Sequence, residues 1–230
     1  MNPTDPHATQ LLAQLLGSVA LLLWGVRMVR TGATRAFGSE LRRVMAACSA
    51  SRLKSFLSGL AVTGLVQSSM ATALVVSSFA ARGLVALPVA LAMMFGADVG
   101  STLVAQVFAF DVKWMWSLAV LAGVVLFNAS ATDRTRGMAR MAIGVGLVLL
   151  SLTHLGEVAQ PLGRSQAFRT VMSAIAGEPF IALLVSAVVT WFVHSSLTIV
   201  LFIMSLAGAG AVTTPEALAL IAGANVGGAF

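Results

Sequence analysis

Two short polar stretches interrupt apolar parts of this chain, and their side chains could bind small ions. The first reads QSS at residues 67–69 and the second reads HSS at residues 194–196. Serine hydroxyls and the glutamine amide both donate and accept hydrogen bonds. Where a helix is interrupted, the N-terminus of the next helix attracts an anion, and freed carbonyl oxygens with hydroxyls coordinate Na⁺. The chemistry predicts a small oxyanion bound together with sodium.

Three titratable or amide side chains accompany these stretches. Asp98 and Asn225 occupy equivalent places in the sequences GADVG and GANVG. An acidic residue within a membrane is costly and usually functional, although a carboxylate bonded to backbone at a helix break is the alternative for Asp98. His194 stands where the first stretch has Gln67. We interpret it as a neutral hydrogen-bonding group, because burial disfavours the imidazolium, with a titratable gate as the alternative.

The two stretches belong to a repeat with an offset of 127 residues. No gap is needed from residue 63 to residue 100 when the chain is shifted by this offset. Shared Pro, Gly and polar residues carry the match, since any two membrane helices share Leu and Val. The matched pairs include Thr63 with Thr190, Gly83 with Gly210, and Pro88 with Pro215. The sequence therefore predicts two copies of one structural unit.

The composition is that of a membrane protein. The 230 residues are 58% hydrophobic and 10% charged, with a mean hydropathy of +0.95, whereas soluble domains carry about 25% charged residues. This predicts an all-α polytopic membrane protein. The net charge of +6 is attributed to cytoplasmic Lys and Arg rather than to nucleic-acid binding. A single cysteine excludes an intramolecular disulfide, and no set of nucleophile, base and orienting residue indicates an enzyme.

Apolar runs predict the elements of each copy. The first copy has a helix at about 9–28, a basic amphipathic segment at 35–54 on the membrane surface, a segment at 56–81 containing QSS, and helices near 87–108 and 114–127. The second has elements at about 141–155, 180–207 and from 215. We predict a first repeat at 1–128, a cytoplasmic connection at 129–140, and a second repeat at 141–230 that is shorter than the first.

The distribution of Lys and Arg predicts how the copies are oriented. Seven lie within 27–54 and three within 129–140, so both regions are expected to be cytoplasmic loops, with the N-terminus outside. An even number of crossings must separate them, yet three apolar segments lie between. We therefore predict that the QSS segment is a re-entrant helical hairpin. Each copy then crosses an odd number of times, which gives two inverted-topology repeats, an architecture typical of secondary transporters.

These motifs resemble those of a known family. QSSMAT at 67–72 resembles the QSSSAT signature of the type II sodium-dependent phosphate cotransporter (Na/Pi) family, in its bacterial members. GADVGST at 96–102 and GANVGG at 223–228 resemble the GANIGTT element of that family. The resemblance extends from about residue 16 to residue 228. It implies sodium-coupled symport of inorganic phosphate into the cell by alternating access, with both QSS-type regions building the binding sites.

The chain departs from the family pattern at several positions. Met70 replaces the third serine, HSSL replaces QSSS in the second copy, and Asp98 stands where an asparagine is frequent. Residues 228–229 read Gly-Ala where two threonines are usual. The loss of hydroxyls leaves fewer ligands for an ion, and Asp98 adds a negative charge that favours a cation and opposes phosphate nearby.

The resemblance and the residues together assign a candidate site. The expected phosphate-binding residues are Gln67, Ser68, Ser69, His194, Ser195 and Ser196. The expected sodium-binding residues are Thr63, Asp98, Thr190, Thr198 and Asn225. No cofactor and no metal other than co-transported Na⁺ is expected. The expected partners are inorganic phosphate, Na⁺ and the lipid bilayer of the inner membrane, with no nucleic acid, and a homo-oligomer or a partner that supplies further helices.

Two other functions remain open from the sequence. One is a degenerate or partner-dependent membrane subunit that does not transport. The other is a proton-coupled carrier of another small anion, in which His194 and Asp98 titrate.

Overall fold

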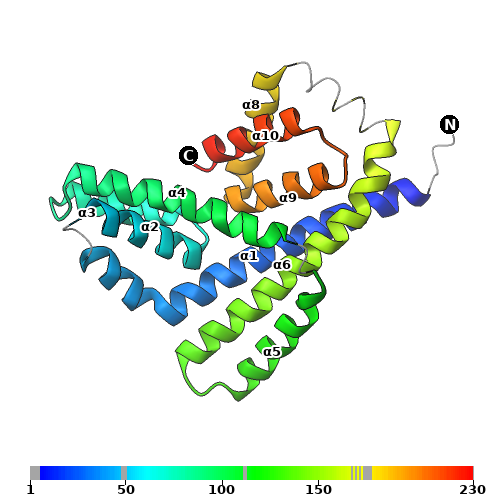
Figure 1. Cartoon of the computed structure of the whole chain (residues 1–230). Coiled ribbons are helices and arrows are strands. Elements are labelled where there is room, and N and C mark those ends of the chain that lie inside the picture. Colours follow the sequence, from blue (N-terminus) through cyan, green and yellow to red (C-terminus); the bar gives the residue numbers. More distant parts are fainter. Residues whose placement is uncertain are drawn as a thin grey trace. The chain divides into compact units, whose positions relative to one another are not determined.

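The structure is a computed structural model that describes residues 6–47, 51–110, 113–166, 168, 170, 172 and 178–229. Regular secondary structure in these residues is helical, without strands (Figure 1). The helices are α1 (Pro6–Ala47), α2 (Arg52–Val66), α3 (Ser69–Ala81), α4 (Leu87–Ala109), the 3₁₀ helix η2 (Lys113–Met115), α5 (Trp116–Ala129), α6 (Asp133–Arg164), α8 (Pro179–Val193), α9 (Ser196–Gly208) and α10 (Thr214–Gly227). The predicted all-helical class is confirmed.

Three helices are long and apolar enough to cross a membrane by length and composition. Their candidate spans are Thr9–Leu41, Leu87–Ala109 and Asp133–Arg164. The helices on either side of each polar stretch are shorter: α2 and α8 have 15 residues, and α3 and α9 have 13. At 1.5 Å per residue these are about 20–22 Å long, less than the roughly 30 Å of a hydrocarbon core. None of these four helices could cross a bilayer by itself.

Two expected boundaries differ from the structure. The segment predicted to lie on the membrane surface from residue 35 continues α1 as far as Ala47. The predicted connection 129–140 is helical from Asp133 onward, so its three arginines lie on α6. Neither region contains a proline, and Arg is a good helix former. Basic charge therefore marks a polar end of a long helix in both places, not an irregular loop.

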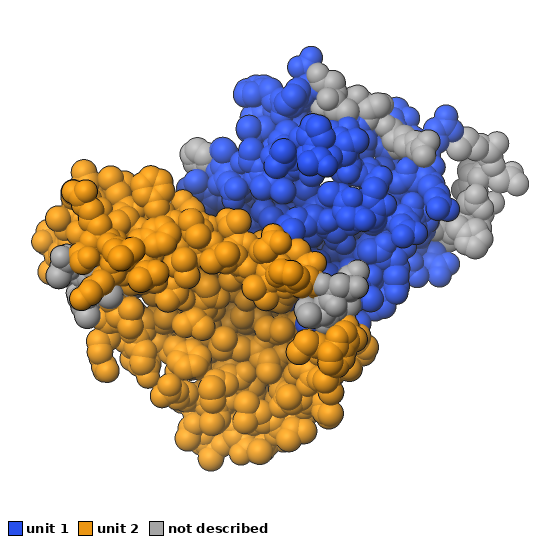
Figure 2. All heavy atoms as spheres, in the orientation of Figure 1, with its two compact units in different colours: residues 1–24, 147–230 blue, residues 25–146 orange. Residues whose placement is uncertain are grey.

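The chain forms two compact units, which are drawn in different colours in Figure 2. One comprises residues 25–146, and the other comprises residues 1–24 and 147–230. Because α1 and α6 each contribute to both units, the compact units do not coincide with the predicted repeats at 1–128 and 141–230. The division into repeats remains a prediction from the sequence.

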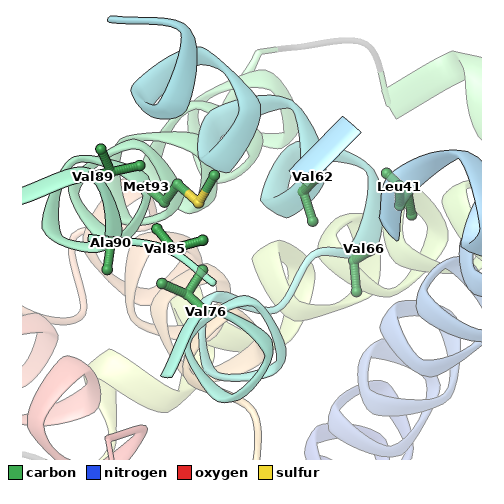
Figure 3. Packing of buried hydrophobic residues seen from close by; sticks show 8 residues of the cluster. All are labelled: Leu41, Val62, Val66, Val76, Val85, Val89, Ala90 and Met93. Carbon is green, nitrogen blue, oxygen red and sulfur yellow. The ribbon is translucent and has the colours of Figure 1, made fainter. Parts of the chain in front are cut away.

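In the unit at 25–146, close backbone contacts and an apolar cluster hold the helices together. A Cβ atom on Gly32 would lie 2.6 Å from the carbonyl oxygen of Gly137, so α1 and α6 approach at their backbones. Side chains from α2, α3 and α4, with Leu41 of α1 and Val85 of the turn before α4, form the cluster shown in Figure 3. Its members are Leu41, Val62, Val66, Val76, Val85, Val89, Ala90 and Met93. The cluster fixes α3 against α4 beside the first polar stretch.

The unit that contains α8, α9 and α10 has its own apolar cluster. Ile199, Ile203 and Leu206 of α9 pack with residues of α10 and with Ala159 of α6. The remaining members of this cluster are Val212, Ala217 and Ala224. Each polar stretch is therefore supported by a separate core.

The sequence repeat is matched by repeated local structure. Helices α8 and α9 have the bounds of α2 and α3 shifted by 127 residues, and α10 begins 127 residues after α4. Gly83 and Gly210 have φ angles of 69° and 71°, and glycine is the residue that adopts this conformation at no steric cost.

The packing partners repeat as well. A Cβ on Gly96 would collide with the carbonyl of Phe56, and a Cβ on Gly223 would collide with that of Leu183. Gly100 and Gly227 make the corresponding approaches one turn later, so α2 runs parallel to α4 and α8 runs parallel to α10. Each polar stretch thus lies between two short helices, of which the first packs along a neighbour in parallel. The helical hairpin, its re-entry into a membrane and the inversion of the copies stay predictions.

Candidate functional site

The first polar stretch is a break between two helices. Helix α2 ends at Val66, Gln67 has the left-handed angles φ 54° and ψ 38°, and α3 begins at Ser69. The N–H of Gln67 donates to the carbonyl of Thr63 over 2.7 Å. Ser68 is extended, with φ −153°, and its Oγ accepts from the N–H of Ala71 at 3.2 Å. Gln67 therefore ends one helix and Ser68 caps the start of the next, which is a favoured role for serine.

The second polar stretch has nearly the same backbone. His194 has φ 54° and ψ 31°, and its N–H donates to the carbonyl of Thr190 over 2.8 Å. Ser195 has φ −153°, and its Oγ accepts from the N–H of Thr198 at 3.4 Å. In the described part of the chain, Gln67 and His194 are the two non-glycine residues with positive φ. Such strained positions cluster at functional sites.

The hydroxyls beside the two breaks are connected differently. The Oγ1 atoms of Thr63 and Thr72 lie 2.8 Å apart and form a buried hydrogen bond that joins α2 to α3. The residue equivalent to Thr72 in the second copy is Ile199. Thr198 instead bonds the hydroxyl of Ser195 at 2.8 Å. The Oγ1 of Thr190 is buried and has no hydrogen-bond partner in the described structure.

The cap residues Gln67 and His194 present different groups. The Oε1 of Gln67 is buried without a hydrogen-bond partner. His194 is exposed, and its Nδ1 lies 3.0 Å from the carbonyl oxygen of Phe192. The interpretation of His194 as neutral assumed that the ring is buried, and the structure removes that reason. Both residues share a backbone position, which the repeat predicted, but their side chains differ in environment.

Asp98 and Asn225 do not lie in the close contacts that α4 makes with α2 and that α10 makes with α8. Both are exposed, whereas Gly96 and Gly223 are buried against the neighbouring helix. Helix α4 is continuous through Asp98, and the carbonyl of this residue accepts from the hydroxyls of Ser101 and Thr102. The alternative of a carboxylate at a helix break is therefore not what the structure shows.

Within each break, the structure brings several of the expected residues together. Ser69 and Ser196 are the first residues of α3 and α9 and are half-buried, next to the capping serines. Thr63 and Thr190 lie in the last turn of the preceding helix with 0% exposure. Thr72 was not among the expected site residues, and neither was Ser186 on α8, whose Oγ is also buried and unpartnered. Their signal in the sequence is a mismatch between the copies: Thr72 aligns with Ile199, and Ser186 aligns with Gly59.

The geometry of a break suits an anion and a cation at once. Free N–H groups at the starts of α3 and α9 and the positive ends of their dipoles favour an anion. The carbonyls at the ends of α2 and α8 favour a cation. Among the described residues, no group of three or more His, Cys, Asp and Glu side chains could hold a metal ion. Hydroxyl and carbonyl oxygens are the ligands that the breaks offer.

Comparison with known proteins identifies the class of membrane protein to which this fold and these breaks belong. The family described as Na+/Pi-cotransporter matches residues 21–157 and 160–230. The chain belongs to this family, as the QSS-type motifs predicted, and the family is one of transporters. No solved structure matches the chain.

Curated relatives carry more specific names. "Putative inorganic phosphate export protein YjbB" of Salmonella typhimurium is 39% identical over 216 residues, which are 94% of this chain and 40% of the relative. The protein of the same name from Escherichia coli strain K12 is 38% identical over the same shares. "Uncharacterized protein YqeW" of Bacillus subtilis is 26% identical over 93% of this chain and 70% of its own. The chain thus spans about two fifths of the length of the YjbB relatives.

Proposed function

We propose that this chain moves inorganic phosphate across the inner membrane by coupling it to sodium. The observation that supports the proposal is the pair of matching helix breaks, each with a left-handed cap residue and a serine that caps the following helix. Broken helices with free ends are a general device of secondary transporters. Membership of the Na+/Pi-cotransporter family supplies the substrate class.

Phosphate is proposed to bind at the starts of α3 and α9. Free N–H groups there can donate to phosphate oxygens. The hydroxyl of Ser68 accepts from Ala71 and so keeps its own proton for donation to the anion. A protonated phosphate oxygen donates a hydrogen bond, and the unpartnered Oε1 of Gln67 is an acceptor for it. Ser69, Ser195, Ser196 and His194 complete the proposed phosphate residues.

Sodium is proposed to bind the carbonyl and hydroxyl oxygens at the helix ends. The proposed sodium residues lie in the last turn before a break or shape its surroundings: Thr63, Thr190, Thr198, Asp98 and Asn225. A bound cation favours an anion nearby through Coulomb attraction, and the coupling is reciprocal by thermodynamic linkage. Phosphate then binds well only with its cation, which is the energetic basis of symport.

The hairpins of α2 with α3 and of α8 with α9 are proposed to re-enter the membrane in inverted copies. Each of their helices is too short to span a bilayer. Irregular backbone at membrane depth is tolerated where it is buried in protein or lines a water-filled cavity. Motion of one repeat against the other would alternate access. The family resemblance implies import, whereas the YjbB relatives are named as export proteins. A symporter runs in the direction that its gradients dictate, so the test measures phosphate import and phosphate export.

The test is transport of radiolabelled phosphate by the 230-residue chain in proteoliposomes. An inward or outward Na⁺ gradient is imposed, with K⁺ in its place as the reference. We expect phosphate to move down the sodium gradient. Ser68→Ala and Ser195→Ala should each lower the phosphate flux about tenfold or more, because each removes a hydrogen bond to a charged ligand.

Ser77→Ala is the matched control for these variants. Ser77 also lies on α3, but it is exposed and bonds the carbonyl of Leu74, so its removal should leave flux unchanged. Equal flux in K⁺ would exclude sodium coupling. No flux from folded protein would contradict the proposal and favour the partner-dependent subunit.

A further inference from the structure

Helix α8 carries two buried hydroxyl groups that make no hydrogen bond in the described structure. They belong to Ser186, which is 4% exposed, and to Thr190, which is 0% exposed. Residues four apart lie on one face of a helix, with Cβ atoms about 5–6 Å apart. The two oxygens therefore lie on one buried face, one turn from each other. In the described residues they are the two hydroxyl oxygens that are buried without a partner.

The first copy of the repeat has no such pair. Gly59 occupies the position equivalent to Ser186, and a Cβ there would collide with the carbonyl of Met93. Thr63 occupies the position equivalent to Thr190, and its hydroxyl is bonded to Thr72. The unpartnered pair is thus a property of the second copy alone. The shared backbone of the two breaks does not require it.

Unsatisfied buried hydroxyls need a physical explanation. Native proteins pair nearly all buried polar atoms, and exceptions often mark a bound ion, water or functional group. A methyl group in place of each hydroxyl would fill the same space without the cost of burying an unpaired polar group. Two such oxygens on adjacent turns of one helix face offer ligands to a bound ion.

The position of the pair selects the charge of that ligand. Thr190 lies in the last turn of α8, which ends at Val193. The C-terminal end of a helix carries partial negative charge and carbonyl oxygens without intrahelical partners. Hydroxyls and carbonyls at such an end suit a hard monovalent cation, as in other carriers with broken helices. An anion is disfavoured at this end and favoured at the start of α9.

We propose that Ser186 and Thr190 provide ligands for a sodium ion in the second copy, and that the first copy has no equivalent ion. This inference rests on the proposed function and refines it. Among the residues proposed for sodium, Thr63 is then one that shapes the surroundings of its break, since its hydroxyl is paired with Thr72. The two breaks share a backbone and differ in what they bind.

The experiment measures sodium binding without phosphate or transport. Thermal unfolding of the 230-residue chain in detergent is followed while NaCl replaces KCl at constant ionic strength. We expect the midpoint of the unmodified chain to rise with Na⁺, as mass action requires for a ligand of the folded state. Thr190→Val and Ser186→Gly should weaken the sodium affinity about tenfold or more, because each removes a ligand to a charged ion. Thr190→Val should be at least as stable as the parent in KCl, since the group that it removes is unsatisfied. Ser186→Gly should be less stable, because glycine loses more conformational freedom on folding than any other residue, so its sodium response is compared with its own midpoint in KCl.

Two further variants separate ligation from general disruption. Ile199→Thr gives Thr190 the hydroxyl partner that Thr72 gives Thr63, so it should weaken sodium binding without removing an oxygen of α8. Thr72→Val removes the hydroxyl pair of the first copy at a residue outside the proposed sodium set, so it should lower stability and leave the sodium affinity unchanged. Weaker sodium binding in the first variant together with unchanged sodium binding in the second supports the inference.

Two outcomes would overturn it. One is a midpoint that responds equally to Na⁺ and K⁺, and the other is an unchanged sodium affinity in Thr190→Val and Ser186→Gly. The phosphate flux assay is separate: sodium-driven flux that keeps its sodium dependence in Thr190→Val would refute this site and leave the proposed transport intact.

Discussion

At the scale of single residues, the two breaks differ by the position of one hydroxyl. In the first copy Thr72 completes a bond from α3 to α2, and in the second copy Thr198 bonds within its own first turn. One helical residue corresponds to a rotation of about 100°, so the neighbouring position points to a different partner. The hydroxyl that joins α3 to α2 in the first copy therefore has no counterpart in the second.

The Thr63–Thr72 bond predicts strong coupling between two substitutions. Thr72→Val should cost about 1–3 kcal/mol of unfolding free energy, because it leaves the hydroxyl of Thr63 buried and unpaired. Thr63→Val should cost less, because the hydroxyl of Thr72 still donates to the carbonyl of Ser68 at 3.2 Å. The double variant should be close to the parent, since no orphaned group remains. The measurement is a double-mutant cycle from denaturant unfolding in detergent. Additive losses would show that the two hydroxyls act independently.

At the scale of elements, the helix before each break packs parallel to a second helix: α2 on α4 and α8 on α10. Gly96 and Gly100 let α4 approach the carbonyls of α2, and Gly223 and Gly227 do the same for α10 on α8. Small residues at such positions allow close backbone approach in membrane proteins. The position of each cap residue relative to its neighbouring helix depends on this contact.

A methyl group at this contact should separate the helices. Gly96→Ala places a Cβ against the backbone of Phe56, which cannot move away as a side-chain end could. We expect a loss of about 1–3 kcal/mol in unfolding free energy, together with reduced phosphate flux. Gly64→Ala is the matched control on α2, because a Cβ there meets nothing within 4 Å. That control should be neutral or stabilising by up to about 1 kcal/mol, and equal losses in both variants would contradict the packing argument.

At the scale of the whole molecule, one repeated unit occurs in two copies, and its predicted inversion concerns their orientation in the membrane. The turns that follow α3 and α9 occupy equivalent positions, with Gly83 and Gly210 in the same conformation. If the copies are inverted, these turns lie on opposite sides of the bilayer. If the copies are parallel, the turns lie on the same side.

Site-directed labelling tests this orientation. Ala81 and Gly208 are equivalent in the repeat and both exposed, so Ala81→Cys and Gly208→Cys are made separately in a Cys48→Ala background. We expect a membrane-impermeant maleimide added to intact cells to label one of them, and the other to react only after permeabilisation. Labelling of both from the same side would exclude inverted copies.

The sequence by itself determined the helical membrane class, the repeat and the location of both breaks. Hydropathy and a 127-residue offset are properties read along the chain, and polar residues inside apolar runs indicate where helices end. Only the tertiary structure decided that Thr63 pairs with Thr72, that Thr190 and Ser186 stay unpaired, and that His194 and Asp98 are exposed. It also decided that α1 continues to Ala47. These features depend on how each helix is rotated about its axis and which neighbour meets each face, and long-range packing sets both.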